Sequence, residues 1–540
     1  MIALLIVFIA VIVLVAIANR INMAYPIVLV LGGMALGYIP HIPTMQLQPD
    51  LVLVVFLPPL LYWESVTAPT SEFRSGALGI FQLAFGLVIA TTLAVAAVAH
   101  AVVPGMPWAV ALVLGAIVSS TDEVAFSAIA DRLNVPRHVI GLIEGESLIN
   151  DATSLILYGV AIAALVGATF SLAHAAGALA LSVTEAIAIG LAAGGFAVLA
   201  WRSIKDDTLQ GAISVVIPFV AYLPAYYIGA SGVLSTVVAG LFVNRYTPTV
   251  LLPRSRELVT GFWVTIVFLL NAFIFVEVGI RFHSIVVGLV RYPLAHLLWY
   301  GLAVSLACIA VRLAWTFGQA FLPFTLQAVV RRPPAPGRDA AHAHGERDWS
   351  HVSVVAWTGM RGGVSLAAAI AIPLSTSVGP FPERDLVIFI TFCVLLATLV
   401  GQGGTLPYVI RALRVKDDGA NEQEERRALA ATAKAALKQI DALQREGTVP
   451  VAMLDALRVR FRARWAEFGS DEDTGKAART TALYRKTECD LLETERKALV
   501  ALRNDGKIDN TVMRRIQRLL DLEVTSIQLL GTTGQSSLDD

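Results

Sequence analysis

The hydrophobic positions divide the chain into two parts. Up to about residue 415, long runs of apolar residues alternate with short polar loops. After that point charged and apolar residues alternate, and no apolar run reaches the roughly 20 residues that a membrane-spanning helix requires. The pattern predicts an all-α membrane domain over residues 1–415 and a helical cytoplasmic domain over residues 416–540.

Counting the apolar runs predicts about 13 transmembrane helices. The basic residues of the loops predict their orientation, because cytoplasmic loops carry an excess of Arg and Lys. With the N-terminus outside, the outer loops hold only Arg281, Arg291 and Arg384, and the other basic loop residues of the membrane part lie inside. An odd number of spans then leaves the C-terminal domain in the cytoplasm.

The composition agrees with this division and excludes several classes of protein. Hydrophobic residues make up 56% of the chain and charged residues 15%, whereas about a quarter of a soluble protein is charged. A net charge of zero gives no indication of a nucleic-acid partner. Cys308, Cys393 and Cys489 are too scattered for a disulfide framework or a zinc site. The sequence contains no nucleophile–base arrangement and no phosphate-binding loop, so no motif indicates an enzyme.

Ionisable residues inside the apolar segments carry the candidate chemistry, because an isolated charge there costs several kcal/mol. A carboxylate without a fixed basic partner must be protonated, hydrated or bound to a cation. A carboxylate that binds either a proton or a cation is the minimum device for cation/proton exchange. The acids outnumber the bases: Glu64, Asp122, Glu123, Glu144, Glu146, Asp151, Glu185 and Glu277 against Arg312 and Arg361.

Asp151 is the best candidate for the exchange site. In a helix, Ser147, Asp151 and Ser154 share one face, and Glu146 and Asn150 share a neighbouring face. Hydroxyl and carboxylate oxygens suit a hard cation such as sodium, and the absence of thiolate or imidazole groups nearby argues against a transition metal.

Two predicted spans are interrupted by polar and glycine residues, at Ser119–Asp122 and at Thr358–Ser365. Such interruptions, one in each half of the membrane part, indicate broken helices that cross at a binding site. Asp122 and Arg361 are placed to compensate the charges of the opposed helix ends. Glu146 and Arg361 are also predicted to form a structural salt bridge, since either charge alone would be strongly destabilising.

Seven segments, in this order, resemble those of the cation/proton antiporter-1 family, the bacterial sodium/proton antiporters related to animal sodium/proton exchangers. Any one of the segments is a weak signal, but the set is specific and covers nearly the whole membrane part. The matching segments are 56–64, 119–125, 144–151, 231–240, 262–279, 357–365 and 402–407.

The resemblance implies an inverted-repeat bundle, in which a six-helix core lies beside a dimerisation domain, in a bacterial cytoplasmic membrane. It implies a homodimer, no cofactor, and exchange of Na⁺ or Li⁺ for H⁺. Asp151 would bind cation and proton alternately, and neutral Asn150 beside it implies electroneutral one-for-one exchange. The residues that would complete the coordination are Thr121 through its backbone carbonyl, Ser147, Asp122 and, in some members, Glu64; Glu146 and Arg361 would form the structural salt bridge.

The chain departs from the family pattern at Tyr226, Glu277 and Glu123. The two extra carboxylates either change the pH response or ion choice, or are hydrated or ion-paired, for instance with Arg312; we favour the second interpretation. A K⁺/H⁺ antiporter is the alternative function. A cation channel or membrane sensor is more distant, because the charges cluster on two interrupted spans and a neighbour instead of forming pore rings.

Helical spacing of apolar residues predicts four helices after the membrane domain, at 424–446, 449–467, 480–505 and 511–530. Acidic and basic residues alternate along them, as on solvated helix faces. The sequence there holds no phosphate-binding glycine loop and no metal-ligand cluster, so it predicts no ligand. A passive appendage, a dimer clamp and a weak regulatory role all remain open.

Overall fold

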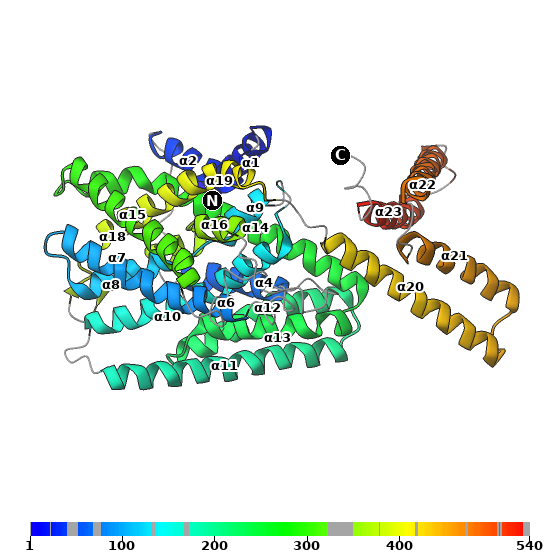
Figure 1. Cartoon of the computed structure of the whole chain (residues 1–540), viewed down its shortest axis with the longest axis horizontal. Coiled ribbons are helices and arrows are strands. Elements are labelled where there is room, and N and C mark those ends of the chain that lie inside the picture. The colour runs from blue at the N-terminus through cyan, green and yellow to red at the C-terminus, as the bar shows by residue number, and fades with distance from the viewer. Residues whose placement is uncertain are drawn as a thin grey trace. The chain divides into compact units, whose positions relative to one another are not determined.

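The computed structural model describes residues 2–21, 23–39, 52–68, 77–130, 133, 135–166, 172–321, 349–376, 379–415, 420–469, 474–504, 507 and 510–532 (Figure 1). These residues are mostly helical, and their one sheet is a short antiparallel pair, β1 (Ser375–Thr376) with β2 (Gly379–Pro380). They form two compact units, and the boundary lies between Val415 and Ala420.

The first unit contains every long apolar helix among the residues that the structure describes. Its first half comprises α1 (Ile2–Arg20), α2 (Tyr25–Gly37), η1 (Val52–Phe56), α4 (Leu57–Thr67), α6 (Ala77–Phe81), η2 (Gln82–Leu87), α7 (Val88–Val102), α8 (Trp108–Ser119), α9 (Glu123–Ala130), α10 (Arg137–Val166) and α11 (Leu172–Ser203). Its second half comprises α12 (Asp207–Tyr227), α13 (Gly232–Val250), α14 (Pro253–Gly288), α15 (Leu294–Gly318), η3 (Gln319–Phe321), α16 (Trp349–Trp357), α17 (Gly363–Ile370), α18 (Arg384–Leu396), η6 (Ala397–Gln402) and α19 (Gly403–Ala412).

Eight helices in the described part of the chain are long and apolar enough to cross a membrane. They lie at Leu78–Val102, Trp108–Ser127, Val139–Leu165, Ala180–Ser203, Asp207–Tyr227, Pro253–Gly288, Leu294–Gly318 and Arg384–Ala412. Shorter apolar helices lie at Leu5–Arg20, Tyr25–Gly37 and Val52–Thr67. The predicted helical membrane architecture is therefore confirmed, while the number of 13 spans stays a prediction.

One bundle of the first unit consists of α7, α8, α10, α15, α17 and α18. Helix α8 packs on α7 and α10, and α15 packs on α7 and α18. Their apolar faces meet in a shared core that includes Val95, Leu114, Val304 and Phe389. This bundle holds one half of each interrupted helix, α8 and α17, and also α10, which bears Asp151.

A second bundle of the same unit consists of α4, α11, α12, α13 and α14. Helices α11 and α13 run side by side, as Figure 1 shows along one edge of the first unit, and α13 also packs on α4. Tyr62, Trp201 and Trp263 are buried where these helices meet. Glu64 lies on α4 and therefore belongs to this second bundle, unlike the other candidate ligands.

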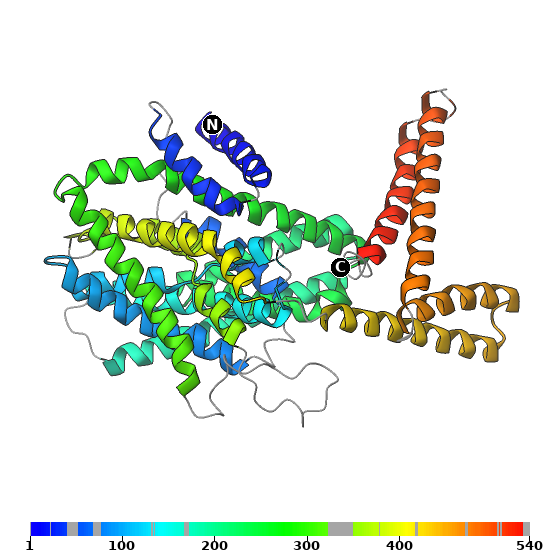
Figure 2. The same cartoon turned by 45° about the horizontal axis from the view of Figure 1, so that its top comes forward.

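The second unit contains two helical hairpins, which Figure 2 shows in gold and in orange to red. Helix α20 (Ala420–Glu446) packs on α21 (Val451–Gly469), and α22 (Thr474–Asn504) packs on α23 (Asn510–Thr532). Leu492, Leu499 and Leu520 are buried between α22 and α23. The four helices lie where the apolar spacing predicts them.

Close approach of α2 and α14 depends on two glycines. A Cβ on Gly279 would lie 2.6 Å from the carbonyl oxygen of Val30, and a Cβ on Gly33 would lie 2.5 Å from that of Val276. We expect Gly279→Ala to destabilise the protein by about 1–3 kcal/mol, because backbone atoms have no room to yield. The measurement is the melting temperature of the purified protein in detergent.

Gly261 is the matched control, because it lies on the same helix and a Cβ there would meet nothing within 4 Å. Gly261→Ala should be neutral or stabilising by about 0.5–1 kcal/mol, since alanine restricts the unfolded chain more than glycine does. A Gly279→Ala protein that melts at or above the temperature of Gly261→Ala would contradict the close packing of α2 on α14.

Candidate functional site

Two unwound stretches of backbone cross inside the first bundle. One separates α8, which ends at Ser119, from α9, and the other separates α16, which ends at Trp357, from α17. The N–H of Asp122 donates to the carbonyl of Met360 (2.8 Å), and the Ser365 hydroxyl donates to the carbonyl of Ser120 (3.3 Å). Both predicted interruptions are therefore confirmed, and they are in direct contact.

Local sequence explains why the helices stop at these places. Ser, Thr and Asp side chains offer backbone groups an alternative to helical hydrogen bonds, and glycine gains little from a helix. The Asp122 carboxylate accepts from the N–H of Val124 (3.0 Å), which caps the start of α9. Gly362 lies against the same carboxylate so closely that a Cβ would overlap it. The crossing therefore requires a glycine opposite Asp122.

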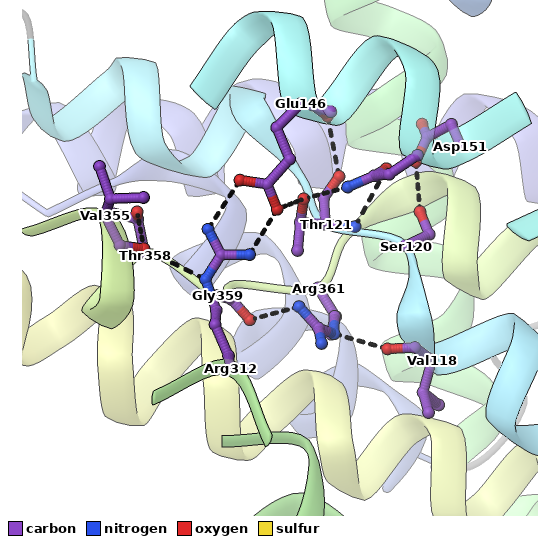
Figure 3. Close-up of polar contacts among 12 residues, drawn as sticks. Val118, Ser120, Thr121, Glu146, Asp151, Arg312, Val355, Thr358, Gly359 and Arg361 are labelled. Atoms are coloured by element: carbon purple, nitrogen blue, oxygen red, sulfur yellow. Dashed lines mark hydrogen bonds and ion pairs between the residues drawn. The ribbon is translucent and has the colours of Figure 1, made fainter. Parts of the chain in front are cut away.

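Asp122 and Arg361 both lie at this crossing, and Figure 3 shows Arg361 with its partners Val118 and Gly359. The Asp122 carboxylate lies at the N-terminal ends of α9 and α17. Arg361 donates from Nε to the carbonyl of Val118 in the last turn of α8 (2.6 Å) and from Nη1 to the carbonyl of Gly359 just after α16 (2.9 Å). Negative charge favours helix N-termini and positive charge favours C-termini, so both charges compensate helix ends as the sequence predicts.

Helix α10 contacts the first break through three buried side chains. The Ser147 hydroxyl donates to the carbonyl of Thr121 (2.8 Å). Asn150 Nδ2 donates to the Thr121 hydroxyl oxygen (2.5 Å), and Asn150 Oδ1 accepts from the Thr121 N–H (3.4 Å). The Asp151 carboxylate, 2% exposed, accepts a hydrogen bond from the Ser120 hydroxyl. The structure thus brings Asp151, Ser147, Asn150 and Thr121 together, with Asp122 next along the chain.

Ser120 is a site residue that the sequence analysis missed, although it lies in the polar run that marked the break. Ser154, which was expected to offer its oxygen on the same helix face as Asp151, instead donates to the backbone carbonyl of Asp151 (3.0 Å). The hydroxyl nearest the Asp151 carboxylate therefore comes from the crossing backbone and not from α10.

Several carboxylates near Asp151 are close enough to interact electrostatically. Glu64, Asp122 and Glu123 each interact with the charge of Asp151 or with one another. Oε2 of Glu64 and Oδ2 of Asp122 are buried without a hydrogen-bond partner within the described ranges of the chain. Like charges that lie near one another raise the free energy of the ionised forms, so the arrangement favours uptake of a cation or a proton.

The salt bridge of Glu146 differs from the prediction. Its carboxylate forms a bidentate salt bridge with Arg312 of α15, with Nη1–Oε1 at 2.5 Å and Nη2–Oε2 at 2.9 Å. Both side chains are 1% exposed. The expected partner, Arg361, is already bound to the helix-end carbonyls of Val118 and Gly359. The parallel forks of guanidinium and carboxylate make this one of the stronger buried pairings.

With this geometry established, the chain can be compared with known proteins. The family model described as "Sodium/hydrogen exchanger, transmembrane" matches residues 5–412. The chain belongs to the sodium/hydrogen exchanger family. Several of its relatives are named antiporters.

Similar exchangers occur in several bacteria. An uncharacterised Na⁺/H⁺ exchanger of Mycobacterium tuberculosis is 35% identical over 530 residues, 96% of this chain and 94% of its own. A sodium, potassium, lithium and rubidium/H⁺ antiporter of Bacillus pumilus is 29% identical over 84% of this chain and 69% of its own. The sodium proton antiporter MjNhaP1 of Methanocaldococcus jannaschii has the same fold, with a TM-score of 0.57 at 18% identity over 75% of this chain and 99% of its own.

The positions that depart from the family pattern lie in different surroundings in this exchanger. Glu277 is fully buried and pairs with Arg281 one turn along α14 (2.9 Å), so it is ion-paired as expected but not with Arg312. Tyr226 is 41% exposed and stacks on Tyr222 at the end of α12. Glu123 is the first residue of α9 and belongs to the group of interacting carboxylates near Asp151.

Removal of Arg312 should strand the buried Glu146 carboxylate. We expect Arg312→Met to destabilise the exchanger by about 3–5 kcal/mol, because an uncompensated buried charge remains. The double variant Glu146→Met/Arg312→Met removes both charges and should recover most of the loss. Folded yield and melting temperature in detergent measure both effects. If the single variant is as stable as the double variant, the buried ion pair does not have the structural role assigned to it.

Proposed function

We propose that this exchanger is a secondary active antiporter that exchanges Na⁺ or Li⁺ for H⁺, with Asp151 binding cation and proton in competition. One observation carries the proposal. The buried carboxylate of Asp151 accepts a hydrogen bond from the Ser120 hydroxyl and has no basic partner in the described part of the chain. A buried carboxylate in that position has to be neutralised by a proton or by a cation.

The chemistry of the surrounding atoms supports a small hard cation as the substrate. Oxygen ligands from carboxylates, hydroxyls and backbone carbonyls suit Na⁺ and Li⁺. The proposed ligands are Asp151, Asp122, the Thr121 carbonyl and Ser147, with Asn150 and Glu64 beside them. Binding of the cation would offset the repulsion among these carboxylates, and protonation of Asp151 would remove it in the other half of the cycle.

Alternating access would bring this site in turn to each side of the membrane. In the proposed architecture, about 13 transmembrane helices form inverted repeats, two of them broken and crossing. The first bundle would move against the second bundle, which consists of α4 and α11–α14. The second bundle would also hold the two subunits of a homodimer together. We further propose the bacterial cytoplasmic membrane as its location, with the N-terminus outside and residues 416–540 as a cytoplasmic domain with a regulatory role.

K⁺/H⁺ exchange by the same mechanism is the second candidate. The name of the Bacillus pumilus relative includes potassium and rubidium among the ions of that protein. Sodium and potassium both bind oxygen ligands, so the two functions differ only in the size of the site that the ligands form.

The direct test of the proposed exchange uses everted membrane vesicles or proteoliposomes that contain a pH-gradient dye. Sodium, lithium and potassium are added in turn, and recovery of fluorescence reports exit of protons against the cation. We expect the wild-type protein to respond to Na⁺ and Li⁺. The response of Asp151→Ala should fall to the level of vesicles without the protein, because the carboxylate that binds both the cation and the proton is then missing.

Asp385 provides the matched control, because its side chain is 62% exposed at the start of α18. Asp385→Ala should keep the wild-type response. Exchange that survives Asp151→Ala at normal protein levels would rule out Asp151 as the exchange site, and a response to K⁺ alone would favour the second candidate function.

Asn150 is proposed to keep the exchange electroneutral. An Asp at this position adds a second titratable carboxylate beside Asp151, so Asn150→Asp should make exchange depend on the membrane potential. Proteoliposomes with a potassium diffusion potential, set by valinomycin in a sodium assay, measure that dependence. We expect no effect of the potential on the wild-type protein, and a voltage-sensitive wild type would refute one-for-one exchange.

A further inference from the structure

The half-helix α17 contacts the exchange site at its first turn and other helices at its far end. All eight of its residues are buried. In the first turn, the Ser365 hydroxyl donates to the carbonyl of Ser120 (3.3 Å). The Ser120 hydroxyl in turn donates to the Asp151 carboxylate, as Figure 3 shows. The far end lies beyond the residues of the proposed site, so the exchange as described does not account for its contacts.

Three successive backbone carbonyls at the far end of α17 each accept a hydrogen bond from a side chain of another helix. Arg384 of α18 donates from Nη2 to the carbonyl of Ile370 (2.8 Å) and from Nε to that of Ile372 (2.9 Å). The hydroxyl of Tyr158 on α10 donates to the carbonyl of Ala371 (3.1 Å). The last carbonyls of a helix lack partners within the helix and carry partial negative charge, so an arginine and a hydroxyl suit this position.

Tyr158 lies on the same helix as Asp151. The two residues are seven positions apart in the sequence, so they share one face of α10 and are separated by about two turns, or roughly 10 Å. Ser365 and Ala371 are six positions apart, which corresponds to roughly 9 Å along α17. The two helix segments therefore have similar lengths, and they run in the same direction from the contact at Ser120 to the contact at Tyr158.

These contacts close a ring that includes the exchange carboxylate, and we call it the α10–α17 ring. From Asp151 it follows α10 to Tyr158 and crosses to Ala371. It then follows α17 back to Ser365 and returns through Ser120 to Asp151. Helices without a proline or bulge bend only gently. The hydrogen bond of Tyr158 therefore restricts how far Asp151 can separate from the backbone of the first break.

We propose that Tyr158 is a positioning residue that sets the ion preference of the exchange site, because its hydrogen bond keeps the α10–α17 ring closed. The closed ring holds the oxygens of Asp151 and of the first break close together before the cation binds. This favours small cations, whose ligands must approach closely. Arg384 still binds the end of α17 to α18 without Tyr158, so loss of the hydroxyl frees α10 from α17 while both helices stay folded.

This inference rests on the proposed exchange at Asp151. Its test compares Tyr158→Phe, which removes only the hydroxyl, with the wild-type protein in proteoliposomes that contain the pH-gradient dye. The KM is measured for Li⁺ and for Na⁺, two cations of different size. Thr391→Val is the matched control. Thr391 is 1% exposed in the first bundle, but its hydroxyl donates to the carbonyl of Val387 within α18 (2.9 Å), so its loss leaves the α10–α17 ring closed.

We expect Tyr158→Phe to raise the KM for Na⁺ about fivefold, the effect of one hydrogen bond, because the cation must then fix a distance that the ring had fixed. The KM for Li⁺ should rise more, so the ratio of the two KM values changes, whereas a general loss of stability would leave that ratio unchanged. The Na⁺-dependent rise in melting temperature, a binding readout without transport, should move to higher Na⁺ concentration in parallel. Thr391→Val should keep both KM values.

Ser365→Ala opens the α10–α17 ring at its other helix-to-backbone hydrogen bond, and it is the deciding variant if Tyr158→Phe does not fold. It should change the KM values in the same direction. Because a ring that is already open loses little from a second opening, the double variant Tyr158→Phe/Ser365→Ala should raise the KM hardly more than either single variant. Two independent supports would instead have additive effects.

The inference is wrong if the folded Tyr158→Phe or Ser365→Ala protein keeps the wild-type KM values, if the two KM values rise in the same proportion, or if the effects of the two substitutions add. A wild-type protein that shows no cation-driven fluorescence recovery, or that responds to K⁺ alone, would instead reject the proposed exchange of Na⁺ or Li⁺, and this inference with it.

Discussion

The ends of four half-helices meet at one crossing, and the balance of charge at that crossing determines much of the remaining structure. Where α8, α9, α16 and α17 end or begin, backbone groups lack their helical partners and carry the partial charges of the helix termini. Asp122 compensates the N-terminal ends and Arg361 the C-terminal ends. Arg361 is then not available for another pairing, and this limits which carboxylates elsewhere in the bundle can be neutralised.

The first consequence concerns Glu146. Since Arg361 is bound to backbone carbonyls, the buried Glu146 carboxylate needs a second arginine, and Arg312 reaches it from α15. Glu277 is likewise paired, with Arg281 of its own helix. Once these pairings are made, Asp151 has a hydroxyl partner but no cation from the described protein residues. Part of the excess of acids over bases thus lies at the crossing, where a transported ion compensates it in the proposed exchange.

Local features of the site could be predicted from the sequence, and contacts across helices could not. The breaks at Ser119–Asp122 and Thr358–Ser365 follow from side chains and glycines that disfavour helix, and these are properties of adjacent residues. The placement of Ser147 and Asn150 near Asp151 follows from helical periodicity. The partner of Glu146 depends on which of two arginines approaches it across the bundle, and the role of Ser120 depends on how an unwound backbone turns. Neither leaves a periodic signal along the chain.

Asn150 links the stability of the crossing to the proposed stoichiometry. An amide donates and accepts at the same time, and Asn150 uses both functions on Thr121, through the hydroxyl oxygen and the backbone N–H. A carboxylate in its place could only accept, and it would also add negative charge beside Asp151 and near Asp122. The neutral side chain therefore holds α10 against the break without joining the group of carboxylates. In the proposed exchange this leaves Asp151 as the one group on this turn of α10 whose charge changes. Asn150 therefore meets two requirements at once: it both donates to and accepts from Thr121, and it adds no second titrating charge.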